Sequence, residues 1–130
     1  MNFKIDTKEK FTVIELLDID LNDNMAADLK NTCTQYMEAN VKNVVLSMQA
    51  VTTISSGIAQ TMALLQKSFY EGNASFVICH ISPDVNKVFE KEELDDILNC
   101  TPSESEAWDI VQMEEIEREL LDGDDFLFES

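Results

Sequence analysis

The longest stretch of this chain without a charged residue runs from Asn43 to Gln66. It opens with an apolar run that ends at Met48 and continues with apolar residues at helical spacing from Ile58 onward. A nearly continuous apolar run is typical of a strand that is covered on both faces, and such strands belong mainly to parallel sheets. Because parallel neighbours are joined by a crossover, usually a helix, the segment predicts an α/β domain.

The remaining sequence adds strands and helices to this core. Apolar alternation predicts strands, and apolar residues three or four positions apart predict helices. We expect strands at residues 3–5, 11–17, 41–48, 74–81 and, more weakly marked, 97–100, and helices at 23–37, 56–71, 83–89 and 101–121. The order β-β-α-β-α-β-α-β-α predicts a small mixed β-sheet flanked by about four helices. We expect one domain at residues 1–121 and an acidic C-terminal tail at 122–130.

Three local patterns mark helix ends. Gly72 is expected to end the second helix in the left-handed conformation. Pro83 is expected at the first position of the third helix, after Ser82. Thr101-Pro102-Ser103-Glu104 is expected to form a capping box at the start of the last helix.

Charge and cysteine content limit the classes of function. The chain has 130 residues, of which 26 are acidic and 9 basic, for a net charge of −17. Repulsion from phosphate excludes a general nucleic-acid binder and a protein that binds anionic membranes. No segment approaches the roughly 20 apolar residues of a membrane span, and the charged N-terminus is unlike a signal peptide. We therefore expect a cytoplasmic protein, with Cys33, Cys79 and Cys100 as free thiols.

The sequence offers no convincing catalytic constellation. Neither of the glycine-rich motifs that bind dinucleotides or nucleotide phosphates occurs. Asp18 and Asp20 resemble the acidic pair of a receiver domain, but the expected third strand ends in Ser47-Met48-Gln49 where that family needs a phosphoacceptor aspartate. His80 is the only histidine, so a triad or a histidine-based metal site has no further members. We predict no catalytic residue, no metal and no cofactor.

Four hydroxyl residues, Thr52, Thr53, Ser55 and Ser56, precede Gly57 at the expected start of the second helix. The simpler interpretation is helix capping, which needs one hydroxyl. The functional interpretation is that a phosphate on Ser56 would lie at the positive end of the helix, beside free backbone N–H groups. Ser55 would then serve as the cap.

With these features on one chain, residues 2–121 resemble a STAS domain of the bacterial anti-sigma factor antagonist family. In that family the second helix opens with an Asp-Ser-Ser/Thr-Gly-Leu motif, and the hydroxyl just before the glycine is phosphorylated by a partner kinase. Ile54-Ser55-Ser56-Gly57-Ile58 matches at the serines and the glycine, whereas Ile54 replaces the aspartate. The resemblance implies that Ser56 is the phosphorylation site.

The resemblance also implies partners. These are an anti-sigma factor that is often a serine kinase, and a phosphatase that resets the switch. Apart from the resemblance, a second copy in a homodimer is left as an open option. The residues expected to bind the partner are Thr53, Ile54, Ser55, Ser56, Gly57 and Ile58. An alternative is a constitutive STAS subunit of a lipid-transport or stress-signalling complex, in which the serine is only a cap. In the acidic tail, Phe126, Leu127 and Phe128 are expected to pack on a neighbouring chain or a partner.

Overall fold

The computed structural model describes the backbone of residues 1–129 and the side chains of residues 1–121. Its main sheet contains β1 (Phe3–Thr7), β2 (Thr12–Leu16), β4 (Val44–Ser47), β6 (Phe76–Cys79) and β7 (Cys100–Thr101), in the order β1-β2-β4-β6-β7. β1 pairs antiparallel with β2, and the other three pairs are parallel. This confirms the predicted mixed sheet, although the last strand covers residues 100–101 where 97–100 was expected.

A second, two-stranded sheet was not predicted. It joins β3 (Asp20–Leu21) in parallel with β5 (Thr53–Ile54). Two-residue strands are too short to show the alternation by which strands are recognised in a sequence. This small sheet fixes the chain just before the helix that carries the hydroxyl residues.

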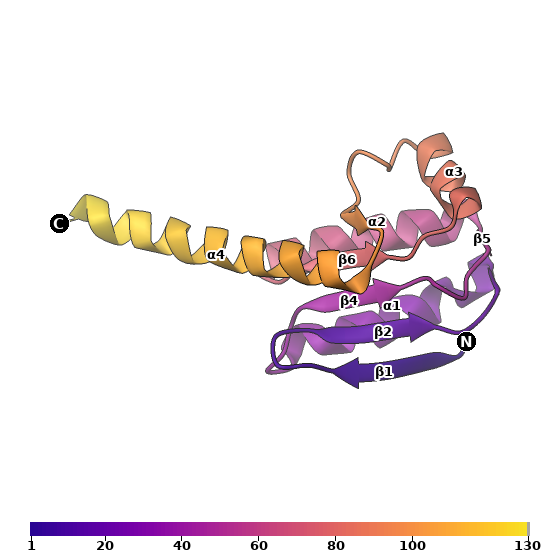
Figure 1. Ribbon diagram of the computed structural model, residues 1–130, viewed down its shortest axis with the longest axis horizontal. Coiled ribbons are helices and arrows are strands. Elements are labelled where there is room, and N and C mark those ends of the chain that lie inside the picture. Colours follow the sequence, from indigo (N-terminus) through magenta and orange to yellow (C-terminus); the bar gives the residue numbers. More distant parts are fainter. Residues whose placement is uncertain (130) are drawn as a thin grey trace.

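Four α-helices cover the two faces of the main sheet. They are α1 (Ala26–Thr34), α2 (Ser56–Glu71), α3 (Pro83–Lys91) and α4 (Glu104–Glu129), and short 3-10 turns flank α1 at Asp23–Met25 and Gln35–Glu38. Figure 1 shows α1 and α2 behind the sheet and α4 in front of it. The predicted fold of a small mixed sheet with four helices is therefore confirmed.

Each face of the sheet has its own apolar core. The larger core packs Leu46 and Ile78 against α1, α2 and α3, and includes the fully buried Phe69, Phe76 and Phe89. The smaller core packs Val45 and Val77 against α4. Because β4 and β6 are central and covered on both sides, all four residues of each strand are buried, as the apolar runs in their sequences predicted.

Two predicted helix ends differ in the structure. Ser103, and not Thr101, caps α4, because the Ser103 hydroxyl accepts a hydrogen bond from the Glu106 amide (3.2 Å) while Thr101 lies in β7. Gly72 keeps an ordinary negative φ after α2, and Asn73 takes the left-handed conformation instead (φ 60°). Asparagine tolerates this region because its short polar side chain can bond locally. Pro83 opens α3 as predicted.

The last helix is longer than the sequence patterns predicted. We expected it to end near Leu121, before Gly123, but α4 continues to Glu129 and extends well past the edge of the sheet (Figure 1). The side chains of residues 122–130 lie outside the described part, so the packing of Phe126, Leu127 and Phe128 stays a prediction, as does the division at residue 121. Among the described residues, no helix is long and apolar enough to cross a membrane.

Candidate functional site

The hydroxyl cluster lies where β5 leads into α2, and β3 holds it in place. The Thr52 hydroxyl donates to the carbonyl oxygen of Ile19 (3.1 Å), and the Thr53 hydroxyl donates to the Asp20 carboxylate (2.5 Å). The Ser55 amide donates to the Leu21 carbonyl (2.9 Å). Residues just before α2 are thus hydrogen-bonded to three successive residues, Ile19, Asp20 and Leu21.

Ser55 is the cap of α2. Its hydroxyl oxygen accepts a hydrogen bond from the Ile58 amide (3.2 Å), which satisfies one of the N–H groups that a helix start leaves unpaired. The same hydroxyl donates to the Asp23 carboxylate (2.5 Å). Both the donor and the acceptor capacity of Ser55 are therefore used inside the fold.

Ser56, the first residue of α2, has the opposite environment. Its side chain is exposed to solvent. In the part of the chain that the structure describes, its hydroxyl makes no hydrogen bond, while the neighbouring Ser55 hydroxyl makes two. The Ser56 hydroxyl is thus accessible, and a group added to it would lie at the N-terminal end of a 16-residue helix.

The two isoleucines of the motif belong to the core. The side chain of Ile54 is 7% exposed and that of Ile58 is fully buried, both within the larger apolar core. Strand β5 directs Ile54 inward, so an apolar side chain is what this position requires here. Among the residues predicted to bind a partner, Thr53 and Ser56 are the exposed ones, and Ser55 and Gly57 are partly exposed.

Asp23 completes the site, and its part in it was not predicted. It begins the 3-10 turn before α1, and Asn22 caps that turn by accepting from the Asn24 amide (3.0 Å). In the fold, the Asp23 carboxylate lies against the start of α2, where a Cβ on Gly57 would overlap it. A negative charge at a helix N-terminus is favourable. No local pattern could reveal a contact between residues this far apart in sequence.

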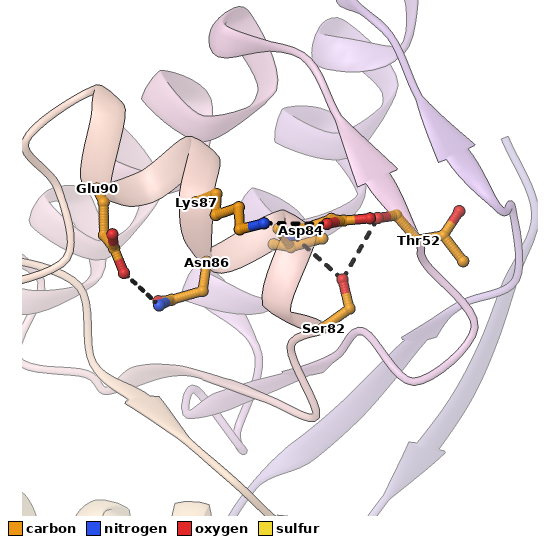
Figure 2. Close-up of polar contacts among 7 residues, drawn as sticks. Thr52, Ser82, Asp84, Asn86, Lys87 and Glu90 are labelled. Carbon is orange, nitrogen blue, oxygen red and sulfur yellow. Dashed lines mark hydrogen bonds and ion pairs between the residues drawn. The ribbon is translucent and has the colours of Figure 1, made fainter.

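The start of α3 lies beside the start of α2. Figure 2 shows the Ser82 hydroxyl between the two segments: it donates to the Thr52 carbonyl (3.3 Å) and accepts from the Val85 amide (3.1 Å). Along α3, Lys87 lies 4.0 Å from Asp84, and the Asn86 amide group donates to Glu90 (2.8 Å). Ser82 thus links the start of α3 to the segment that leads into β5 and α2.

We call the exposed surface formed by these two helix starts the helix-start surface. It consists of five exposed residues from the β4–α2 connection, α2 and α3: Thr52, Thr53, Ser56, Pro83 and Asp84. Apart from Asp84, these residues carry no charge, although the exposed carboxylates of Asp20 and Asp23 lie beside them, bonded to Thr53 and Ser55. The exposed Ser56 hydroxyl and the uncharged side chains around it are suited to contact with another protein.

The three cysteines are thiols in partly or fully buried positions. Burial raises the pKa of the Cys33 thiol to about 12 and that of Cys79 and Cys100 to about 11, so these thiols are neutral at pH 7. A neutral thiol is a poor nucleophile and a poor metal ligand. Among residues with described side chains, no group of three or more His, Cys, Asp or Glu residues is placed to hold a metal ion.

Comparisons with solved structures reveal the same fold in bacterial regulators. An anti-sigma-factor antagonist (STAS) domain protein from Planctomyces limnophilus is 18% identical over 81% of this chain and 93% of its own, with a TM-score of 0.70. The anti-sigma factor antagonist SpoIIAA, unphosphorylated, is 18% identical over 85% of this chain and 96% of its own, with a TM-score of 0.68. At these identities the likeness establishes the fold alone.

The fold also occurs within a larger protein. The murine anion transporter Slc26a9 matches 80% of this chain with 18% of its own length, at 12% identity and a TM-score of 0.67. No curated protein sequence matches the chain significantly.

Family membership rests on the sequence itself. The profile of the STAS domain matches residues 2–107, which include the five strands of the main sheet and the helix-start surface. The predicted family is thus confirmed: the chain belongs to the STAS domain family.

Proposed function

We propose that this protein is a non-enzymatic regulator of the anti-sigma factor antagonist type, acting in the cytoplasm. Its helix-start surface binds an anti-sigma factor with serine kinase activity, and phosphorylation of Ser56 releases that partner. The observation that carries the proposal is the difference between the environments of two neighbouring serines. Ser55 caps α2, which leaves the exposed Ser56 hydroxyl available for modification.

Electrostatics explains how one phosphate would act on this surface. A phosphoserine carries about −1.5 to −2 charges at pH 7. On Ser56 it would stand next to Ser55 and Gly57, the two residues that the Asp23 carboxylate already contacts. Phosphate and carboxylate would then compete for one helix N-terminus, and the negative charge beside Asp20, Asp23 and Asp84 would rise sharply. A partner fitted to the unphosphorylated surface would be repelled without refolding of the domain.

The comparisons support this proposal through one relative. SpoIIAA has been solved in a phosphorylated form as well, 18% identical to this chain over 85% of it, with a TM-score of 0.61. SpoIIAA therefore has this fold both without and with the phosphate. Phosphate on a domain of this shape is compatible with the fold, as the exposure of Ser56 also suggests for this chain.

A second candidate function is a constitutive subunit without a switch. It is favoured by Ile54, which is buried where the family motif has aspartate, and by Asp23, whose carboxylate already occupies the start of α2. In this version the helix-start surface is a permanent contact within a larger lipid-transport or stress-signalling assembly, and Ser56 is one of its contact residues.

Affinity capture from the native cytoplasm tests the proposal. Wild-type protein and Ser56→Ala should retain the same kinase-like partner, whereas Ser56→Asp, a partial mimic of phosphate, should lose it. Ser68→Asp is the matched control, because Ser68 is also exposed on α2 but lies in its C-terminal half. Equal recovery with Ser56→Asp and wild-type protein would contradict the switch.

A further inference from the structure

The far side of α4 carries an apolar stripe that the fold does not use. Met113, Ile116 and Leu120 are 54%, 54% and 60% exposed. The helix buries a different side against the sheet, through Ala107 and Val111. The spacing of the stripe, three residues and then four, is the a/d spacing by which one helix packs along another.

Acidic side chains border this stripe. With Met113 and Leu120 at a positions and Ile116 at d, the adjoining e and g positions are Glu117 and Glu119, both exposed. The one basic residue of α4 does not balance them, because Arg118 turns to the domain and donates to the Ser75 hydroxyl (3.3 Å). The exposed apolar stripe is therefore bordered by the acidic side chains of Glu117 and Glu119.

The stripe lies beyond the residues that the family profile matches. The match to the STAS profile ends at residue 107, before Met113. From there α4 continues to Glu129 and runs past the sheet (Figure 1). In sequence, the same spacing continues through Gly123 to Leu127, with Asp124 at the next e position.

We propose that this stripe docks an amphipathic helix from a partner protein, one whose apolar seam is bordered by Lys or Arg. Charges at e and g positions select the partner of a packed helix. A second copy of this chain would place Glu117 and Glu119 against identical carboxylates, which disfavours self-association. A basic helix would face them with opposite charge. This interface is separate from the helix-start surface and does not rest on the function proposed for it.

A synthetic helical peptide tests the inference on the full-length protein. It has Ile and Leu at its a and d positions and Lys at e and g, and its control carries Glu at e and g. Fluorescence anisotropy should show binding of the Lys peptide, weaker at high salt, and no binding of the Glu peptide. The double variant Ile116→Ser/Leu120→Ser should weaken binding at least about tenfold, because two aliphatic contacts are lost.

Matched variants separate this docking from simple charge attraction. Leu64→Ser is the control, because Leu64 is 64% exposed on α2, away from the stripe. It should leave the affinity within about twofold of wild type. Equal affinity of the stripe variant and wild-type protein, or no binding of the Lys peptide, would overturn the proposal. So would a dimer of the protein alone, seen by light scattering and lost in the stripe variant, because it would make a second copy the occupant.

Discussion

Ser55 and Ser56 show how much the environment of one residue can differ from that of the next. Both lie at the start of α2, yet Ser55 makes two hydrogen bonds and Ser56 projects into solvent. The assignment of Ser55 as the cap followed from the sequence because capping is local. The part played by Asp23 did not, since it depends on a fold that brings the start of α1 to the start of α2.

The two serines should contribute differently to stability. Ser55→Ala should lower the free energy of unfolding by about 1 kcal/mol, because the cap and the contact with Asp23 are both lost. Ser56→Ala should change it by less than about 0.5 kcal/mol, as expected for an exposed side chain. Urea unfolding followed by the fluorescence of Trp108, the single tryptophan, measures both. Equal losses, or a larger loss for Ser56→Ala, would contradict the assignment of the cap.

At the scale of elements, the sequence predicted the members of the main sheet and their helices, and it failed where tertiary contacts decide. The runs that became β4 and β6 were recognised because burial on both faces makes them uniformly apolar. The start of α4 was misassigned because Thr101 has the right spacing for a cap, but the pairing of β7 with β6 holds it in a strand. Strands β3 and β5 were not predicted, because a strand of two residues is too short to show an alternation of apolar and polar side chains.

Removal of residues 122–130 should leave the domain intact. Within the described residues, Val111 is the last α4 side chain that is buried, and the polar contacts to the body end with Arg118. The melting temperature of the truncated protein, measured by circular dichroism, should therefore stay within about 2 °C of the full chain. A loss of more than about 5 °C would mean that the tail packs on its own domain. If Phe126, Leu127 and Phe128 contact a neighbouring chain or a partner, the truncated protein should differ from the full chain in its mass by light scattering or in its affinity for the partner.

For the whole molecule, the main electrostatic feature is the large excess of acidic over basic residues. The net charge is −17, and among the residues with described side chains only Lys8–Asp6 and Lys87–Asp84 form ion pairs. Folding brings these like charges together, so self-repulsion opposes the compact state. This acidity was readable from composition, whereas the contacts of Asp20 and Asp23 with the segment before α2 required the structure.

Salt should therefore stabilise the protein. Raising NaCl from about 0.01 M to 0.15 M shortens the screening length from about 30 Å to about 8 Å, so repulsion between surface carboxylates is reduced. The melting temperature should rise over this range. Binding of the Lys peptide to α4 should weaken over the same range. An unchanged or falling melting temperature would show that repulsion is not a significant cost of folding here.

The most direct test of the switch is to map the phosphate. Lys42 and Lys67 border the uncharged segment, so trypsin releases residues 43–67 as one peptide that contains Thr52, Thr53, Ser55 and Ser56. The purified protein is incubated with ATP and the kinase recovered by affinity capture, and the peptide is fragmented in a mass spectrometer. We expect one phosphate, on Ser56, and none in the Ser56→Ala variant. Phosphate on Ser55 or Thr53, or on no residue of this peptide, would contradict the proposed switch.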